Sequence, residues 1–222
     1  MACGPNAAAS YEDGHSAKQI VSDASSSTGS ATSYHITING TTQDGPASID
    51  FDVSGTNVQG TVTGQGMSLR IVHVNGQSFV NGADLAALLE KTDPQAASIV
   101  KAKASDKWVL MPSTFWSSTT MTNTIDMQKM STCLKGATGL KKKGTSTISA
   151  QKVVEVDDQQ NAKMFVQTSA PHYFMRVSLT GGDPCVTDSS VSDEMIDLTK
   201  VGQKLDISVP QGFVDLQTLA SS

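Results

Sequence analysis

Short segments in which apolar and polar residues alternate restrict the fold of this chain more than any other feature. The segment 34–38 reads YHITI, and the same rhythm returns along 49–53 and 67–71. Alternation with a period of two places the apolar side chains on one face of a strand. Asn-Gly dipeptides at 39–40 and 75–76 are typical of the tight turns that join antiparallel strands. The pattern therefore predicts an antiparallel sheet with one apolar and one solvated face.

The strand rhythm returns in the last third of the chain. Within the segment YFMRVSL we expect Tyr173, Met175, Val177 and Leu179 to share one face, because they alternate with other residues. The strands expected in this part of the chain lie at 146–148, 152–156, 164–167, 173–179, 195–198 and 205–209.

Helical patterns lie before and between the two groups of strands. Ser16 and Gln19 have the spacing of a capping box, and apolar residues then recur at helical intervals over 16–25. Asp93-Pro94 is a typical helix start, with aspartate as the cap and proline at the first helical position. Further helices are predicted at 83–89 and at about 123–134. The order of helix, strands, helices and strands predicts an α+β fold, with helices gathered on one side of an antiparallel sheet.

Composition and charge exclude several classes of protein. The 222 residues are enough for one domain that buries its own core. A net charge of −5 argues against a general nucleic-acid binder, which needs a basic surface. The sequence has no run of 18 apolar residues that could span a membrane. Its polarity comes largely from hydroxyls, with 28 Ser and 23 Thr.

Residues for catalysis or metal binding do not form a recognisable set. The four histidines have no Cys, Asp or His at the spacing of metal ligands, so no metal site is predicted. The strand histidines His35 and His73 are interpreted as surface residues. A G-x-S-x-G motif is absent, and the four glutamates form no pair for acid–base work. We therefore predict neither an enzyme nor a cofactor.

The three cysteines allow two interpretations each. Cys3 lies in the small, polar segment 1–14, which is predicted to be a flexible tether; the thiol is either the acylation site of a bacterial lipoprotein or incidental. No basic and apolar signal segment precedes it, so a signal is expected to be absent or removed. Cys133 and Cys185 are either a disulfide, which an exported location would favour, or two buried thiols.

Several segments together resemble the LppX/LprG-type lipoproteins of actinobacteria. They are the tail cysteine, AKQIVSDA, SYHITING, ASIDFDVSG, NVQGTVT, MSLRIVHVNGQSFVNG, KWVLMP, YFMRVSLTG, LDISVP and VDLQTLA. The resemblance covers about residues 15–219 and assigns 15–222 to a single lipoprotein domain. It implies a curved antiparallel sheet, a half-open β-barrel with helices covering its concave side, similar in shape to the LolA/LolB carriers.

The resemblance also implies a function. Members of the family are tethered outside the cytoplasmic membrane, and several bind or carry lipids or glycolipids in an apolar cavity. Cys3 matches the acylated cysteine, so we expect a lipid-anchored, monomeric envelope protein. The family has no motif for the lipid contacts. From the alternation of apolar residues we predict that the cavity is lined by Ile38, Phe51, Val62, Ile71, Leu89, Met127, Met130, Met175 and Val177.

Two hypotheses of different kinds follow. In the first, the protein binds and carries lipid or glycolipid without catalysis, because burying each methylene is worth about 0.8 kcal/mol. In the second, an envelope-anchored module has a filled core and binds a protein or polysaccharide partner through its hydroxyl-rich surface. A cavity beside the apolar faces would favour the first hypothesis, and a filled interior would favour the second.

Overall fold

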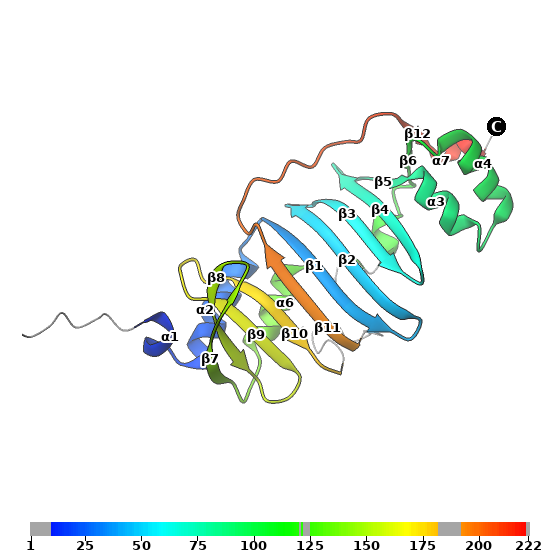
Figure 1. Ribbon diagram of the computed structural model, residues 1–222. Coiled ribbons are helices and arrows are strands. Elements are labelled where there is room, and N and C mark those ends of the chain that lie inside the picture. The colour runs from blue at the N-terminus through cyan, green and yellow to red at the C-terminus, as the bar shows by residue number, and fades with distance from the viewer. Residues whose placement is uncertain (1–9, 120, 122–124, 182–191, 221–222) are drawn as a thin grey trace, which may run out of the picture.

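The computed structural model describes residues 10–119, 121, 125–181 and 192–220 (Figure 1). Strands dominate, with helices before, between and after them. The strands are β1 (Ser33–Thr42), β2 (Gly45–Ser54), β3 (Asn57–Gly64), β4 (Met67–Val74), β5 (Gln77–Asn81), β6 (Trp108–Leu110), β7 (Lys141–Ile148), β8 (Gln151–Asp157), β9 (Ala162–Gln167), β10 (Phe174–Leu179), β11 (Ser192–Thr199) and β12 (Phe213–Asp215). The helices are α1 (Tyr11–Gly14), α2 (Ala17–Gly29), α3 (Gly82–Leu89), α4 (Pro94–Ala104), the 3₁₀ turn η1 (Trp116–Ser118), α6 (Met127–Lys135) and α7 (Leu216–Ala220).

All of these strands form one curved sheet. Their order is β12-β6-β5-β4-β3-β2-β1-β11-β10-β9-β8-β7, so β12 and β7 are its two edges. The neighbours pair antiparallel except for β12 and β6, which are parallel. Figure 1 shows the sheet as an open, twisted surface. The predicted α+β fold with a curved antiparallel sheet is confirmed.

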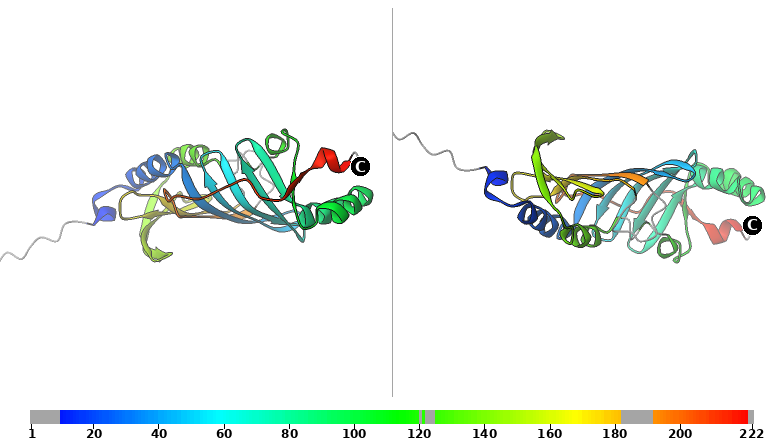
Figure 2. Two further views of the ribbon diagram at one scale, coloured as in Figure 1. Left: turned by 90° about the horizontal axis from the view of Figure 1, so that it is seen from above. Right: turned by 90° about the horizontal axis from the view of Figure 1, so that it is seen from below.

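The helices pack on one face of this sheet. Phe51 pairs with Ile36 and Gly60, Gly60 pairs with Ile71, and Ile71 pairs with Val80, so these residues share a face. At one end this face packs under α2 and α6, and at the other end it packs under α3, α4 and α7. Figure 2 shows the two groups of helices at opposite ends of the sheet. We call the helix-covered face the concave face.

Helix α2 forms as its sequence predicts. The Ser16 hydroxyl accepts a hydrogen bond from the Gln19 backbone N–H, and the Gln19 side chain accepts one from the Ser16 backbone N–H. These bonds satisfy donors that a helix start leaves free. Ile20, Val21 and Ala24 then face the core with almost no exposed surface. The chain forms helix α2 here because its cap and its apolar stripe agree.

The domain begins earlier than the predicted boundary at residue 15. Residues 11–14 form the short helix α1, and the Tyr11 hydroxyl donates to Asp23 at 2.8 Å. The Tyr11 ring stacks on His172 with 3.7 Å between ring centroids. A flexible tether was expected through residue 14, but these contacts fix residues 11–14 to the domain. Residues 1–9 lie outside the described part.

The outer face is covered in part by the segment 201–212. Ile207 packs on Val72, Val74 and Phe79, which form a small cluster on the side of the sheet away from the helices. The predicted strand at 205–209 is wrong, because this extended segment pairs with no neighbouring strand in the described structure. It crosses the sheet instead and leads into β12 (Figure 2).

The sheet needs a glycine at position 60. A Cβ atom there would lie 1.9 Å from the Asp50 carbonyl oxygen and 2.6 Å from Cδ1 of the fully buried Phe51. Gly60→Ala is therefore expected to lower the free energy of unfolding by about 1–3 kcal/mol, as overpacking does. Gly64→Ala in the same strand is the control, because its Cβ would meet Ala47 at an ordinary 3.7 Å. Equal urea midpoints for the two variants would contradict this account.

Candidate functional site

A row of apolar side chains crosses the concave face between the two groups of helices. Ile38 pairs with Ile49, Ile49 with Val62, and Val62 with Leu69. Ile38 is buried, but Ile49, Val62 and Leu69 are only half-buried. We call these three residues the central strip. Apolar surface left partly open in the middle of a covered sheet face is a candidate contact surface for an apolar ligand.

Three residues, one of them Val62 of the central strip, contact the packed cores at both ends of the concave face. Val62, Trp116 and Met121 each pack against the core under α2 and α6 and also against the core under α3, α4 and α7. Trp116 comes from η1, which follows β6 in the chain. The half-buried Leu89 at the end of α3 packs against the second of these cores. The concave face thus carries two packed cores. They are joined by the partly exposed residues Val62, Trp116 and Met121, which we call the junction.

A pocket of about 530 Å³ adjoins this junction. Its volume falls within the range of about 300–1,000 Å³ that is usual for small-molecule sites. Apolar and aromatic side chains form much of its wall, and polar groups lie at the loop between β2 and β3 and at the start of α6. The lining residues are Gly29, Ala31, Thr32, Tyr34, Val53, Gly55, Thr56, Val58, His73, Trp116, Ile125, Asp126, Met127 and Gln128.

His73 is part of this pocket wall, so its interpretation as a surface residue is wrong. It lies two residues after Ile71 on the same face of β4, and it is 9% exposed. Its ring stacks on Trp116 with 4.6 Å between centroids, and Nδ1 lies 2.9 Å from the Ser78 hydroxyl oxygen. Burial lowers the pKa of His73 below its ordinary value of 6.5. A neutral imidazole therefore supports Trp116 at the pocket. His35, by contrast, lies on the outer face as expected.

Acid is expected to weaken the fold through His73. The unfolded chain takes up a proton on this histidine as the pH falls through about 6.5, whereas the folded chain does so only at lower pH. The free energy of unfolding should therefore fall with decreasing pH below about 6.5. Urea titrations at several pH values measure this loss. His73→Gln should be less sensitive to pH in that window, and an unchanged pH dependence would contradict the assignment.

Tyr34 fixes the opposite wall of the pocket. Its hydroxyl donates to the Ile125 carbonyl oxygen at 2.7 Å, joining β1 to the chain just before α6. Burial, together with the nearby Asp126 carboxylate, raises the pKa of Tyr34 to about 12. Asp126 caps α6 by accepting from the backbone N–H groups of Gln128 and Lys129. The start of α6 is thus held against the sheet.

The predicted lining residues fall into different environments. Ile38, Phe51, Met127, Met130 and Val177 belong to the core under α2 and α6, and Ile71 belongs to the other core. Phe51, Ile71 and Val177 are essentially without exposed surface, so they are core residues. Val62 is half-buried at the junction, Leu89 is half-buried against the core under α3, α4 and α7, and Met127 lines the pocket.

Met175 lies apart from the other predicted lining residues. The pairing of β10 with β9 shifts between Phe174 and Arg176, and the irregularity breaks the expected alternation. Phe174 therefore joins Val177 in the core, whereas Met175 lies beside Tyr173 in a separate pocket of about 330 Å³. The prediction that Tyr173, Met175, Val177 and Leu179 share one face is wrong for Tyr173 and Met175.

The sequence-predicted cysteine sites lie mostly outside the described residues. Cys133 lies on α6 and is disulfide-bonded. Cys3 and Cys185 both fall outside the described part, so the pairing of Cys133 with Cys185 and the acylation of Cys3 stay predictions.

The outer face carries a chain of polar side chains that resembles part of a catalytic triad. His35 Nδ1 lies 2.9 Å from an Asp52 carboxylate oxygen, and Nε2 lies 3.3 Å from the Thr37 hydroxyl oxygen. Thr37 lies in mid-strand, where β1 pairs with β2 on one side and with β11 on the other. Backbone N–H groups engaged in these ladders are not free to form an oxyanion hole. The described residues also contain no cluster of potential metal ligands.

The open antiparallel sheet, covered by helices at its two ends, is a fold that solved structures share. LprF from Mycobacterium bovis has this fold, with a TM-score of 0.61 and 13% identity over 88% of this chain and 97% of that one. The Mycobacterium tuberculosis lipoprotein LppX matches with a TM-score of 0.50 and 14% identity over 86% of this chain and 98% of that one. The predicted resemblance to LppX/LprG-type lipoproteins is therefore confirmed at the level of the fold.

Sequence comparison adds no further relative. No family model matches the chain, and no curated protein matches it by sequence. Within the described residues, no helix has the length and apolar character needed to cross a membrane.

Proposed function

We propose that this protein binds lipids or glycolipids on its concave face, at the central strip and the adjoining pocket. The observation that carries the proposal is the partly exposed apolar junction of Val62, Trp116 and Met121 between two packed cores. An acyl chain laid on this junction would remove apolar surface from water on both sides. Each methylene buried contributes about 0.8 kcal/mol, so a long chain gains enough to leave water.

The fold shared with the lipoprotein LppX supports an anchored location in the cell envelope. In this proposal an acylated Cys3 holds the domain on the outer side of the cytoplasmic membrane. The bound lipid is the partner, the protein acts as a monomer, and it carries out no catalysis and binds no nucleic acid. Transport follows if the bound lipid is released to a second membrane or protein.

A second candidate function is that of an envelope-anchored module that binds a protein or polysaccharide. It is favoured by the nearly complete burial of Phe51, Ile71 and Val177, because these predicted lining residues are part of a filled core. The two candidates differ in whether an acyl chain reaches Trp116.

Tryptophan quenching by a brominated fatty acid tests the proposal at the site itself. The chain has two tryptophans: Trp116 lies at the junction, and Trp108 packs with the outer-face cluster of Val72, Val74 and Phe79. A Trp108→Phe protein, which keeps Trp116, should be quenched in a saturable way. A Trp116→Phe protein should not be. If neither protein is quenched, the interaction-module function is favoured; equal quenching of both would place the lipid elsewhere.

A further inference from the structure

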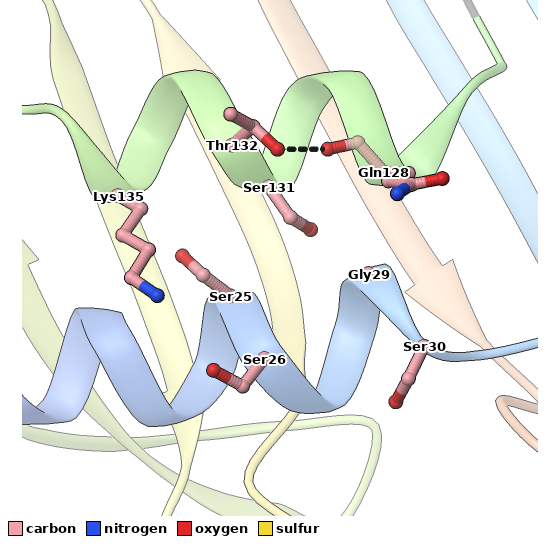
Figure 3. A pocket seen from close by; sticks show the side chains of 8 residues that line it. All are labelled: Ser25, Ser26, Gly29, Ser30, Gln128, Ser131, Thr132 and Lys135. Atoms are coloured by element: carbon pink, nitrogen blue, oxygen red, sulfur yellow. Dashed lines mark hydrogen bonds between the residues drawn. The ribbon is translucent and has the colours of Figure 1, made fainter.

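Helices α2 and α6 pack against each other through small residues. A Cβ atom on Gly29 would lie 3.3 Å from the Ser131 Cβ, which shows how closely the two backbones approach. Figure 3 shows the helices side by side, with the Ser25 side chain pointing toward α6 and the Ser131 side chain pointing toward α2. The facing surfaces are thus made of hydroxyls and glycine, unlike the apolar undersides of the same helices.

A pocket of about 390 Å³ opens between these helices. It is separate from the pocket at Trp116, although Gly29 and Gln128 line both. Among the residues that the structure describes, no aspartate or glutamate lines it, although the chain as a whole carries a net charge of −5. Lys135 is the one charged residue in the described part of its wall, and its side chain reaches from α6 toward Ser25 and Ser26 (Figure 3). The lining residues are Ser25, Ser26, Gly29, Ser30, Gln128, Ser131, Thr132 and Lys135.

Two hydroxyls of this pocket are buried without a hydrogen-bond partner in the described structure. Ser25 is 5% exposed and Ser131 is 2% exposed, and neither Oγ atom is bonded. The more exposed hydroxyls are occupied: Ser26 donates to the Ser22 carbonyl oxygen at 2.9 Å, and Thr132 donates to that of Gln128 at 2.7 Å. Burying an unbonded hydroxyl disfavours folding, so such a pair calls for an explanation.

We propose that this pocket binds a phosphate-type oxyanion, either free or as the phosphomonoester headgroup of a lipid. Ser25 and Ser131 each have an unused O–H donor, and the Lys135 ammonium has only donors. A phosphate group offers several strong acceptor oxygens and negative charge, which match these donors and this cation. The described residues of the pocket wall include no carboxylate that would repel an anion. The site is distinct from the acyl-binding junction and does not depend on it.

Titration of the full-length protein with inorganic phosphate, followed by calorimetry, tests the site directly. Ser131→Ala and Lys135→Gln should each weaken binding about tenfold or more, because each removes a hydrogen bond to a charged group. Ser27→Ala and Lys18→Gln on α2 are matched controls outside the pocket wall, and they should bind like the parent protein. Ser131→Ala should also leave the urea midpoint unchanged or raise it, since the hydroxyl it removes is unbonded.

Vesicle binding distinguishes free phosphate from a phosphomonoester lipid headgroup as the ligand. Vesicles of phosphatidylcholine with added phosphatidic acid present a phosphomonoester, and those of phosphatidylcholine alone do not. Binding of inorganic phosphate that Ser131→Ala and Lys135→Gln weaken supports the site for free phosphate. Binding only to phosphatidic acid vesicles, weakened by the same variants, supports it for a headgroup. Binding to neither probe, or binding that the variants leave unchanged, overturns the proposal. A large loss of stability in Ser131→Ala would also overturn it, because the serine would then serve packing.

Discussion

Val62→Asp is expected to abolish lipid binding while the domain still folds. Val62 lies in the central strip and packs against both cores of the concave face, so an acyl chain on the junction would cover it. A carboxylate under that chain would lose its water without gaining a partner. The cost of removing a charge from water is several kcal/mol, and about 3 kcal/mol already corresponds to roughly a hundredfold in affinity. Binding of a fluorescent fatty acid measures the effect.

Thr63→Asp is the matched control for this variant. Thr63 is the next residue of β3, and its side chain lies on the opposite, solvated face. The control should bind fatty acid like the parent protein, and circular dichroism should show both variants folded. If Val62→Asp folds and still binds with the parent affinity, the lipid does not lie on the central strip.

Phe51→Ala is expected to cause a large loss of stability, about 3–5 kcal/mol in the free energy of unfolding. Phe51 has no exposed surface, and it pairs with Ile36 on one side and Gly60 on the other. Its ring lies against the position where Gly60 lacks a side chain. Alanine would leave a cavity there that neighbouring strands cannot close. Urea unfolding of the purified variant measures the loss.

Phe213→Ala provides the comparison for Phe51→Ala. Phe213 is 42% exposed and contacts Phe79 edge to face, with 5.1 Å between ring centroids. Its loss should cost clearly less than the loss of Phe51, because much of the Phe213 ring is already in water and the aromatic pair itself contributes only about 0.5–1.5 kcal/mol. A Phe51→Ala protein as stable as Phe213→Ala would show that Phe51 lines open space instead of filling the core.

The elements with strong local signals could be predicted from the sequence. Helix α2 starts at the predicted capping box, and the alternating segments 34–38, 49–53 and 67–71 all lie in paired strands. These signals come from residues close together in the chain. The segment 205–209 also alternates, but its apolar residues face the outer side of the sheet, where Ile207 packs without strand pairing. Alternation alone does not distinguish a paired strand from an extended cover.

The site itself depends on contacts between distant parts of the chain. The Tyr34 hydroxyl bonds to the carbonyl of Ile125, 91 residues later, and His73 stacks on Trp116. No local pattern marks these contacts, and Trp116 was not among the predicted lining residues. His73 could have been found, since it continues the alternation of Leu69 and Ile71 on the apolar face of β4.

Differences in burial explain why only some of the predicted lining residues lie at the candidate site. Alternation identified the correct face for residues such as Phe51 and Val62, but it carries no information about depth. The helices cover Phe51 completely and leave Val62 half open. At Met175 the irregular pairing of β10 reverses the face, and a sequence pattern of period two cannot show such a shift.

Native mass spectrometry of the full-length protein purified from a bacterial host tests lipid binding most directly. Spectra are recorded before and after extraction with organic solvent, and the extract is analysed separately. We expect additional masses that correspond to lipids, that disappear on extraction and that are reduced in Val62→Asp but retained in Thr63→Asp. A folded parent protein that carries only its own polypeptide mass in every spectrum, and that takes up no added fatty acid, would contradict the account.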